Sequence, residues 1–430
     1  VCWCGRCAWA GTVEAVTRRP SSPASPVPPA GTLPPPIHAG EPAFRATRLA
    51  LFAGGFSTFW LLYWVQPLMP MLAHDFGLSP ASSSAALSFA TGAMALALLP
   101  ASLLADRYGR RTLMCGGLLA AALLTLVMAV APDWHGLLAL RLLCGLLLAG
   151  MPAVAMAYLA EEFDPAALGS VMGLYIGGNA LGGMSGRLVG VWLADALSWR
   201  MAAVAVGLVG LAGAVYFLRR LPPSRRFVPR PLPFSAEGRA SLAAGLREAL
   251  GDRGLLALYA TSFLIMGAFV SLYNYLGFRL AGAPFFLSHS VIGFIFMLYM
   301  VGTLASALSG RLSRRFGRGP VLRTMLGVMA ASLLLTLTDA LVLVVAGVAG
   351  LTFSFFAGHA VASSWVGARA QSAKALAAAL YLSAYYLGSS LVGSSSGLLW
   401  SWGQWTGVAG VLVVAVLLAL AATWRLSDKG

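Results

Sequence analysis

The stretch "SLLADRYGRR" at residues 102–111 places one negative and three positive charges between two long apolar runs of the sequence. A related stretch, "GRLSRRFGRG", recurs at residues 310–319, where Gly317 stands at the place of Gly109. The two copies indicate a chain built as a repeat, with a charged loop at the same point of each half. The charged residues of the first copy are Asp106, Arg107, Arg110 and Arg111.

The composition of the chain is typical of a membrane protein. Of its 430 residues, 59% are hydrophobic and 10% are charged, whereas soluble globular domains are about 25% charged. The mean hydropathy is +0.81, and a single soluble core does not grow to this size. The apolar runs are continuous rather than alternating, which favours membrane-spanning helices over a barrel. We therefore expect an all-α integral membrane fold.

Twelve apolar segments of membrane-spanning length follow Ala46, since a helix needs roughly 20 apolar residues to cross a bilayer. They form two sets of six, divided by an arginine-rich linker at 219–254. Because six is an even number, both sets start on the same side of the membrane, which predicts two parallel six-helix repeats. The predicted spans are 47–73, 81–104, 112–131, 137–160, 167–194, 198–218, 255–278, 289–309, 321–338, 340–365, 376–400 and 403–424.

The predicted domains follow from these segments. Residues 1–45 are rich in Pro and Ser and are expected to be disordered. The linker contains "AEGRASLAAGLREALGD" at 236–252, which is typical of an amphipathic helix at the membrane surface. The expected domains are a tail at 1–45, an N-terminal bundle at 46–218, the linker at 219–254, a C-terminal bundle at 255–424 and a tail at 425–430.

The net charge of +15 is explained by membrane topology. Nearly all Arg and Lys residues fall in one set of loops, whereas the other set offers little beyond Arg200 and Arg279. The positive-inside rule places the arginine-rich loops, and with them both termini, in the cytoplasm. No nucleic-acid recognition module accompanies the basic residues. We expect a multi-pass protein of the cell inner membrane, surrounded by lipid bilayer and without a nucleic-acid partner.

The sequence indicates no metal site, no cofactor and no enzymatic chemistry. Cys2, Cys4 and Cys7 crowd the start of the chain, but no Cys or His cluster with the spacing of a zinc site follows them. No nucleophile–His–acid grouping and no Gly-rich nucleotide loop is found. We expect a protein that is not an enzyme.

The repeated charged loop resembles a motif of the major facilitator superfamily, Gly-x-x-x-Asp-Arg/Lys-x-Gly-Arg/Lys-Arg/Lys between spans 2 and 3. Ser102 replaces the first Gly, and the second copy keeps Gly310 but has Arg314 in place of the acid. Joined to the twelve spans and the repeat, the resemblance covers about residues 46–424. The chain also looks like the bacterial drug:proton antiporters, although the proline of their glycine-rich motif in span 5 is absent here.

This resemblance implies a conformational latch, in which the loop makes contacts in one state of the transporter that break in the other. A carboxylate at Asp106 can meet basic groups or a helix N-terminus, and Gly109 permits a tight turn. The alternative is that the basic residues only set the topology. The implied latch residues are Asp106, Arg107, Gly109, Arg110, Gly310, Arg315, Gly317 and Arg318.

Candidates for coupling transport to protons are few, because no Asp or Glu lies in the middle of a span. "RLLCG" at Arg141 resembles an Arg-x-x-x-Gly pattern of family span 4 that is linked to proton transfer, and a charge inside a span is a functional hypothesis by default. The alternative is an arginine that reaches water from near the membrane surface. His359 is the only histidine deep in a span. The coupling candidates are Arg141, Glu161, Glu162 and His359.

Aromatic and polar residues in spans 1, 5, 7 and 11 predict a substrate cavity at mid-membrane between the repeats, with an aromatic interface belt as the alternative for the Trp and Tyr residues. The cavity candidates are Trp60, Tyr63, Trp64, Gln66, Asn179, Tyr273, Asn274, Tyr381 and Tyr385. Two sets of glycines at four-residue spacing in span 5 predict close helix packing. The packing candidates are Gly173 and Gly177 of the first set and Gly182 and Gly186 of the second.

The function implied by the resemblance is alternating-access transport of a small organic solute, outward and coupled to protons, by a monomer. A uniporter or an importer of a specific metabolite or sugar is the first alternative, favoured by the missing carboxylate inside the spans. A membrane receptor that binds a solute without moving it is the second, and such a receptor is expected to lose the latch that this chain keeps.

Overall fold

The structure is a computed structural model that describes residues 34–227, 236–371, 373–424 and residue 426. Nearly all of these are helical, and the described residues contain no strand beyond an isolated bridge between Ile37 and Phe163. The first half holds α1 (Pro42–Tyr63), η1 (Gln66–Leu68), α2 (Met69–Phe76), α3 (Pro80–Tyr108), α4 (Arg110–Met128), α5 (Trp134–Leu148), α6 (Gly150–Glu162), α7 (Pro165–Ala196) and α8 (Trp199–Arg220). After α9 (Ala236–Gly251), the second half holds α10 (Arg253–Ala281), α11 (His289–Gly293), η2 (Phe294–Leu298), α12 (Tyr299–Phe316), α13 (Arg318–Leu335), α14 (Leu341–Arg369), α15 (Lys374–Ser395), η3 (Ser396–Leu399) and α16 (Trp400–Thr423).

Each predicted span coincides with helix, which confirms the all-α membrane fold. Ten stretches of the described residues are long and apolar enough to cross a membrane. One of these, Lys374–Thr423, carries the last two predicted spans, and its backbone leaves helical geometry at Gly403 and Gln404, between them. The 32-residue helix α7 covers the fifth predicted span.

The folded part of the chain begins earlier than predicted. Residues 1–33, and with them most of the expected tail, lie outside the described residues, as do 425 and 427–430 of the C-terminal tail. Ile37, however, is buried, and its backbone bonds to the carbonyl of Glu162 at 2.7 Å and to the N–H of Asp164 at 3.2 Å. Helix α1 already starts at Pro42, because proline has no N–H to lose in the first turn. The predicted boundary at residue 45 is therefore too late.

Side-chain caps fix where several helices start. Ser79, Asp133 and Ser198 each accept a hydrogen bond from a backbone N–H in the first turn of the helix that follows, α3, α5 and α8 respectively. Asp252 caps α10 in the same way and also pairs with Arg369 at 2.7 Å. Partial burial would raise the pKa of the Asp252 carboxyl, but Arg369 and the backbone N–H of Leu255 hold that pKa below its usual value. The charged carboxylate thus anchors the end of the linker to α14.

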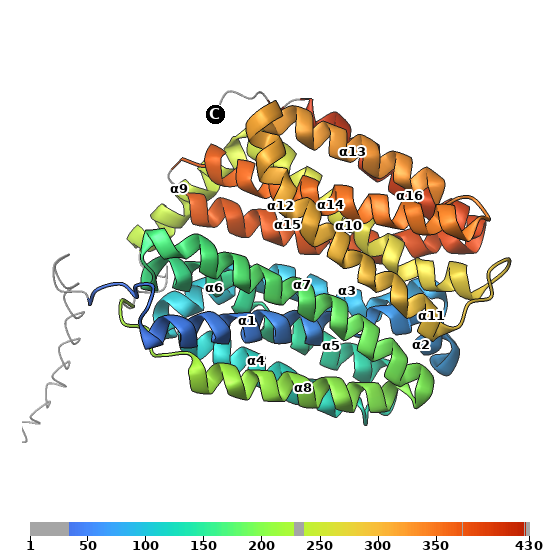
Figure 1. Cartoon of the computed structure of the whole chain (residues 1–430), viewed down its shortest axis with the longest axis horizontal. Helices are drawn as coiled ribbons and strands as arrows, with labels where there is room; N and C mark the ends of the chain where they lie inside the picture. Colours follow the sequence, from blue (N-terminus) through green and yellow to red (C-terminus); the bar gives the residue numbers. More distant parts are fainter. Residues whose placement is uncertain (1–33, 228–235, 372, 425, 427–430) are drawn as a thin grey trace, which may run out of the picture. The chain divides into compact units, whose positions relative to one another are not determined.

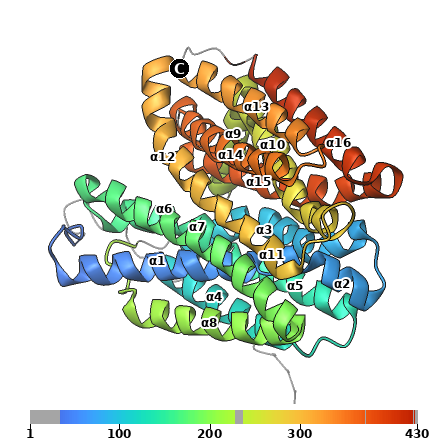
Figure 2. The same cartoon turned by 45° about the vertical axis from the view of Figure 1, so that its right-hand side comes forward.

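The helices gather into two bundles within the compact unit from Pro35 onward. In the first, α7 packs along α1, α3 on α5 and α4 on α8; in the second, α10 packs along α15, α13 on α14 and α10 on α16. Figures 1 and 2 show these two groups, and Figure 1 shows α2 and α11 at one end and α9 at the other. We call the end that carries the loops at 107–111 and 314–318 the arginine-rich end, and the end that carries η1, α11 and η3 the opposite end.

Glycines let α7 lie directly on the backbone of α1, although not all at the predicted positions. A Cβ on Gly178 or Gly182 would collide with the carbonyl oxygen of Phe52 or Phe56, and one on Gly186 would lie 2.9 Å from that of Trp60. The predicted Gly173 and Gly177 have no neighbouring atom within 4 Å of a Cβ, so the structure corrects these two positions. The glycines that meet α1 and its C-terminal cap are Gly178, Gly182, Gly186 and Gly190, so the helix face in contact runs through Gly178 and not through Gly177.

The same contact occurs in the second half, as expected of a repeat. "LYIGGNALG" ends at Gly182 and "LYLSAYYLG" ends at Gly388. A Cβ on Gly388 of α15 would collide with the carbonyl oxygen of Phe263 in α10, just as one on Gly182 would collide with Phe56. The two glycines therefore allow the same close approach of backbones in equivalent helix pairs, α1 with α7 and α10 with α15.

Candidate functional site

Arg187 of α7 lies at the seam between the two bundles and is 2% exposed. Its guanidinium carbon is 4.0 Å from the ring centre of Tyr63 and 4.6 Å from that of Tyr299, which belong to opposite halves of the chain. Its Nε donates to Oε1 of Gln66 at 2.6 Å, and its Nη1 donates to the carbonyl of Gly183 at 2.7 Å. The site is thus centred on a cation held between aromatic rings.

A chain of amides continues from Arg187 across the seam. Nε2 of Gln66 donates to Oδ1 of Asn274 at 2.8 Å and to the carbonyl of Val270 at 3.3 Å, both in α10. Nδ2 of Asn274 then donates to the carbonyl of Gly393 in α15 at 3.2 Å. Both amide side chains are buried. Four elements, α7, η1, α10 and α15, are therefore joined by one hydrogen-bonded path.

Aromatic side chains of the second half form the other wall of the seam. The hydroxyls of Tyr273 and Thr352 are hydrogen-bonded at 2.8 Å. The ring of Tyr273 is stacked on Phe296 with centroids 5.3 Å apart and lies 5.2 Å from that of Tyr299. The ring of Phe269 lies 5.1 Å from that of Tyr273 and is stacked on Phe355, whose ring lies 6.3 Å from that of Tyr385. The predicted cavity residues Tyr63, Gln66, Tyr273, Asn274 and Tyr385 thus meet here.

His359 of α14 lies beside this aromatic wall. Its Nδ1 is 3.0 Å from the hydroxyl of Tyr381, and its ring is 4.7 Å from that of Tyr385, both in α15. The structure therefore brings one coupling candidate and two cavity candidates together.

The seam is closed toward the opposite end. The carboxylate of Asp195 in α7 accepts from the backbone N–H of Ser290 at 3.1 Å and also from its hydroxyl. Indole Nε1 of Trp192 donates to the carbonyl of Ser290 at 3.2 Å. Ser88 of α3 bonds to Ser394 of α15 at 2.7 Å. These contacts join the two halves between the site around Arg187 and the opposite end.

At the arginine-rich end, the predicted latch is an ion-pair cluster inside the first half. Arg110 donates through Nε to Glu161 at 2.6 Å and pairs with it again through Nη2, which also lies 3.2 Å from Asp106. The carboxylate of Glu162 accepts from the backbone N–H groups of Arg225 and Arg226, both at 3.1 Å. Two coupling candidates are thus occupied in holding the loop and the linker.

The turn glycines of both loop copies adopt backbone angles that favour glycine. Gly109 has φ +98° and Gly317 has φ +84°, a region that is essentially restricted to glycine at their ψ values. The side chain of Arg107 is exposed, so the structure shows no latch contact for it. These turns could be predicted from local sequence alone, because the backbone conformation at each turn requires a glycine at that position.

The second copy of the loop borders a hollow instead of an ion-pair cluster. A space of about 620 Å³ lies between α12 and α14 and is lined by Gly310, Gly317 and Arg318, among others. Arg315 lies over the ring of Phe316, 5.1 Å from its centre. Arg314 stands where the first copy has Asp106, which pairs with Arg110. The two loops are therefore alike in backbone conformation and different in charge.

Arg141, the remaining coupling candidate, binds backbone carbonyls. Its Nε donates to Ala86 at 2.7 Å, its Nη1 to Leu61 at 3.1 Å and its Nη2 to Leu62 at 2.6 Å. The side chain is fully buried, which rules out the alternative that it reaches water. Arg141 therefore ties α5 to α3 and to the last turn of α1.

Three predicted cavity residues lie away from the seam. Indole Nε1 of Trp60 donates to the carbonyl of Val206 in α8 at 2.9 Å. Trp64 packs against Gly190, and the amide oxygen of Asn179 against Gly55 of α1. The glycine contacts bring α7 so close to α1 that these side chains are covered inside the first half. Of the predicted aromatic face in span 1, only Tyr63 reaches the seam.

Arg187 and Tyr299 were missed by the sequence predictions. A signal for Arg187 was present, since the rule that a charge inside a span indicates function applies to Arg187 as well as to Arg141. Tyr299 gave no such signal, because a tyrosine in a membrane helix is ordinary. Within the described residues, no group of three His, Cys, Asp or Glu side chains could hold a metal ion.

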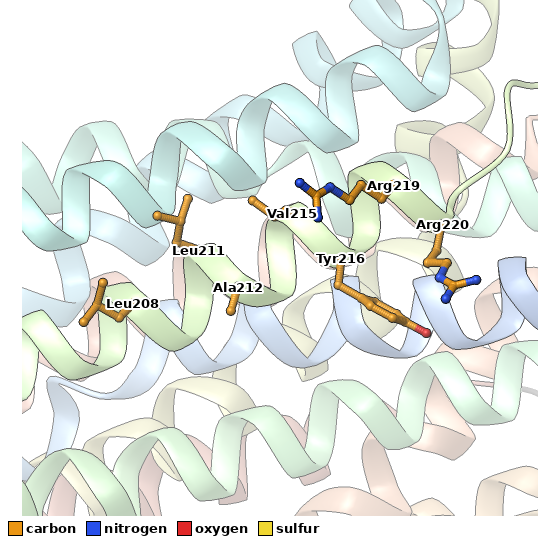
Figure 3. A pocket seen from close by; sticks show the side chains of 7 residues that line it. All are labelled: Leu208, Leu211, Ala212, Val215, Tyr216, Arg219 and Arg220. Atoms are coloured by element: carbon orange, nitrogen blue, oxygen red, sulfur yellow. The ribbon is translucent and has the colours of Figure 1, made fainter.

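A hollow on the outer face of α8 is unrelated to the seam. It has a volume of about 560 Å³ and is lined by side chains of this one helix, from Leu208 to Arg220. Figure 3 shows them along the helix, with Tyr216 and Arg220 near its end. Leu208 is 54% exposed, as expected where lipid chains cover a membrane helix.

Comparisons with known proteins identify the family. The family model of the Major Facilitator Superfamily matches residues 51–288. The inner membrane transport protein YnfM of Escherichia coli (strain K12) is 44% identical over 393 residues, which are 91% of this chain and 93% of that protein. An uncharacterized MFS-type transporter, YybF of Bacillus subtilis (strain 168), is 42% identical over 384 residues, which are 89% of this chain and 94% of that protein.

The fold is shared with solved transporters. A bacterial homolog of the human lysosomal transporter Spinster, in an inward-facing and unoccupied conformation, superposes with a TM-score of 0.74 at 17% identity, covering 89% of this chain and 97% of that one. The family match spans more than half of the sequence, and the relatives cover nearly all of it. This chain therefore belongs to the major facilitator superfamily and is a membrane transporter rather than an enzyme.

Proposed function

We propose that this transporter exports a small organic solute across the inner membrane in exchange for protons, acting as a monomer with both termini in the cytoplasm. The observation that carries the proposal is the seam: aromatic and polar residues of both halves meet around Arg187, and the contacts that join the halves lie from there to the opposite end. A solute bound at the seam would leave toward the opposite end once these contacts open.

The latch supports a rocking motion of the two halves. Arg110 holds Asp106 and Glu161 together at the arginine-rich end of the first half, next to the turn at Gly109. When the halves tilt to close this end, the same charges come within reach of the second half, whose loop is purely basic at Arg311, Arg314, Arg315 and Arg318. Exchange of one set of ion pairs for another gives two states of similar energy.

His359 is the best candidate to carry the proton. It lies at mid-membrane, next to Tyr381 and Tyr385, on the wall of the seam. The carboxylates of Glu161 and Glu162 are bound to Arg110 and to the linker backbone, and Asp195 is bound to Ser290. A proton on His359 would change the charge of the seam in the presence of solute.

Uniport or import remains the second candidate, and one observation favours it. No Asp or Glu lies in the middle of any predicted span, whereas many proton-driven transporters carry one. Such a protein would use the same seam and latch but move its solute along the solute's own gradient.

Efflux from a bacterial strain that lacks its major exporters tests the proposal. The wild type, Asp106→Asn and His359→Gln are expressed at matched levels, and accumulation of drugs, dyes and sugars is measured with and without an uncoupler. Lower accumulation with the wild type, restored by the uncoupler and by either substitution, is expected. Accumulation that rises with the wild type would establish import instead, and accumulation that the uncoupler leaves unchanged would exclude proton-driven export.

A further inference from the structure

Arg187 is a buried cation without an anionic partner in the described part of the chain. The ion pairs found there lie at the ends of helices, and none includes Arg187. Nε and Nη1 are hydrogen-bonded to the neutral groups of Gln66 and Gly183. Within the same described residues, no acceptor is bonded to Nη2. The Nη2 amino group, which carries two N–H donors, is therefore left without a protein acceptor among these residues.

The part of the second half that packs against α7 offers no carboxylate to Arg187. No Asp or Glu occurs between residues 253 and 338, the segment that holds α11, η2 and α12, which contact α7. Burying a charge without a counter-charge costs several kcal/mol even in the presence of neutral hydrogen-bond partners. Retaining Arg187 at a 2% exposed position is explained if the counter-charge arrives from outside the protein.

The surroundings of Arg187 define the rest of the ligand. Tyr63, Phe296 and Tyr299 present their rings to the guanidinium at 4.0, 5.7 and 4.6 Å, and Tyr273 stacks on Phe296. An arginine among aromatic rings matches a solute with an anionic head and a flat apolar body. We infer that Arg187 binds the head group of an aromatic organic anion, a carboxylate or a sulfonate, as the transported solute.

This inference rests on the proposed transport function and adds a link between binding and opening. A carboxylate or sulfonate takes both hydrogen bonds of the fork formed by Nε and Nη2. It then replaces Oε1 of Gln66 as the acceptor for Nε. Gln66 is released from Arg187, and its hydrogen bonds to Asn274 and Val270 are left to hold it across the seam. The arriving anion thereby loosens the contact that closes the seam.

Three probes of similar size and fixed charge test the inference: benzenesulfonate, benzamide and benzyltrimethylammonium. Their binding to the purified full-length protein is measured at equilibrium, and their uptake is measured in proteoliposomes. We expect benzenesulfonate to bind at least tenfold more tightly than the other two. Arg187→Gln should weaken its binding at least tenfold, and Arg187→Lys should give an intermediate loss because an ammonium lacks the fork.

The control variant is Arg200→Gln, which removes an arginine that is stacked on Trp199 near the opposite end and should leave benzenesulfonate binding unchanged. If Arg187→Gln does not fold, the inference is tested by two other results. These are the preference of the wild type among the three probes and the loss of benzenesulfonate binding in Arg187→Lys. Equal binding of benzamide or of the cation, or no binding of the sulfonate, overturns the inference. Transport of another solute without sulfonate binding would overturn it while leaving the transport function intact, whereas binding without uptake would overturn transport alone.

Discussion

Nε of Arg187 donates a 2.6 Å hydrogen bond to Gln66, and Gln66 in turn donates a hydrogen bond to Asn274 in the other half of the chain. Gln66 therefore gives the buried cation of the first half a hydrogen-bonded connection to the second half, beside the direct contacts of Arg187 with the rings of Phe296 and Tyr299. It follows Tyr63 by three residues, at the point where α1 ends and the 3₁₀ turn η1 begins. Because α1 ends at Tyr63 and the chain turns there, the amide of Gln66 lies beside the guanidinium of Arg187.

Replacing Gln66 by Leu should favour opening of the seam at the opposite end. Gln66 makes two hydrogen bonds to neutral groups across the seam, at Asn274 and Val270. Each contributes about 0.5–1.5 kcal/mol, and losing about 1.4 kcal/mol in total shifts a two-state equilibrium about tenfold. The measurement is the labelling rate of Leu276→Cys by a membrane-impermeant maleimide added outside the cell. Leu276 is buried and lines a closed cleft with Gln66 and Tyr273, so its exposure reports opening.

We expect Gln66→Leu to raise that labelling rate about tenfold. Cys2, Cys4 and Cys7 are replaced by Ser in all variants, and the buried Cys115 and Cys144 are left in place. Gln371→Leu is the matched control, because Gln371 is exposed at the arginine-rich end and should not alter labelling. An unchanged rate in Gln66→Leu would mean that the amide does not help to close the seam.

Local features of this fold could be predicted from the sequence. Gly109 and Gly317 mark the same turn in the two halves because only glycine takes that backbone conformation readily. Gly182 and Gly388 mark equivalent helix contacts because a Cβ would strike the facing backbone. Each of these signals lies in a short stretch of sequence and recurs in the second half, where it can be recognised.

Which way a side chain faces could not be predicted in the same way. A helix that is apolar all round carries no amphipathic signal, since lipid and protein interior are equally apolar. Trp60 and Tyr63 are neighbours on one side of α1, yet Trp60 is bonded to α8 and Tyr63 lies on Arg187. The surroundings of Arg187 depend on Tyr299, which is far away in the sequence, and that pairing exists only in the folded chain.

The turn at Gly109 gives a second prediction, concerning stability. Gly109→Ala forces a residue with a Cβ to φ +98°, which costs about 1–3 kcal/mol. The thermal unfolding midpoint of the purified protein should fall. Gly116→Ala is the matched control in the next helix, where a Cβ meets no atom within 4 Å. A fall of the same size in both variants would show that the loss comes from the added methyl group and not from the turn.

The contact of α7 with α1 gives the last prediction, for which the chain supplies its own control. In Gly182→Ala, the added methyl group meets the carbonyl oxygen of Phe56, a backbone atom that cannot rotate away. Forcing extra atoms into a packed interface costs about 1–3 kcal/mol, so the unfolding midpoint should fall. Gly177→Ala lies five residues earlier in the same helix, where nothing stands within 4 Å of a Cβ. There alanine should be neutral or should stabilise the helix by about 0.5–1 kcal/mol. Thermal unfolding of both variants under one set of conditions measures the difference, and equal midpoints would show that α1 and α7 do not need the close approach at Gly182.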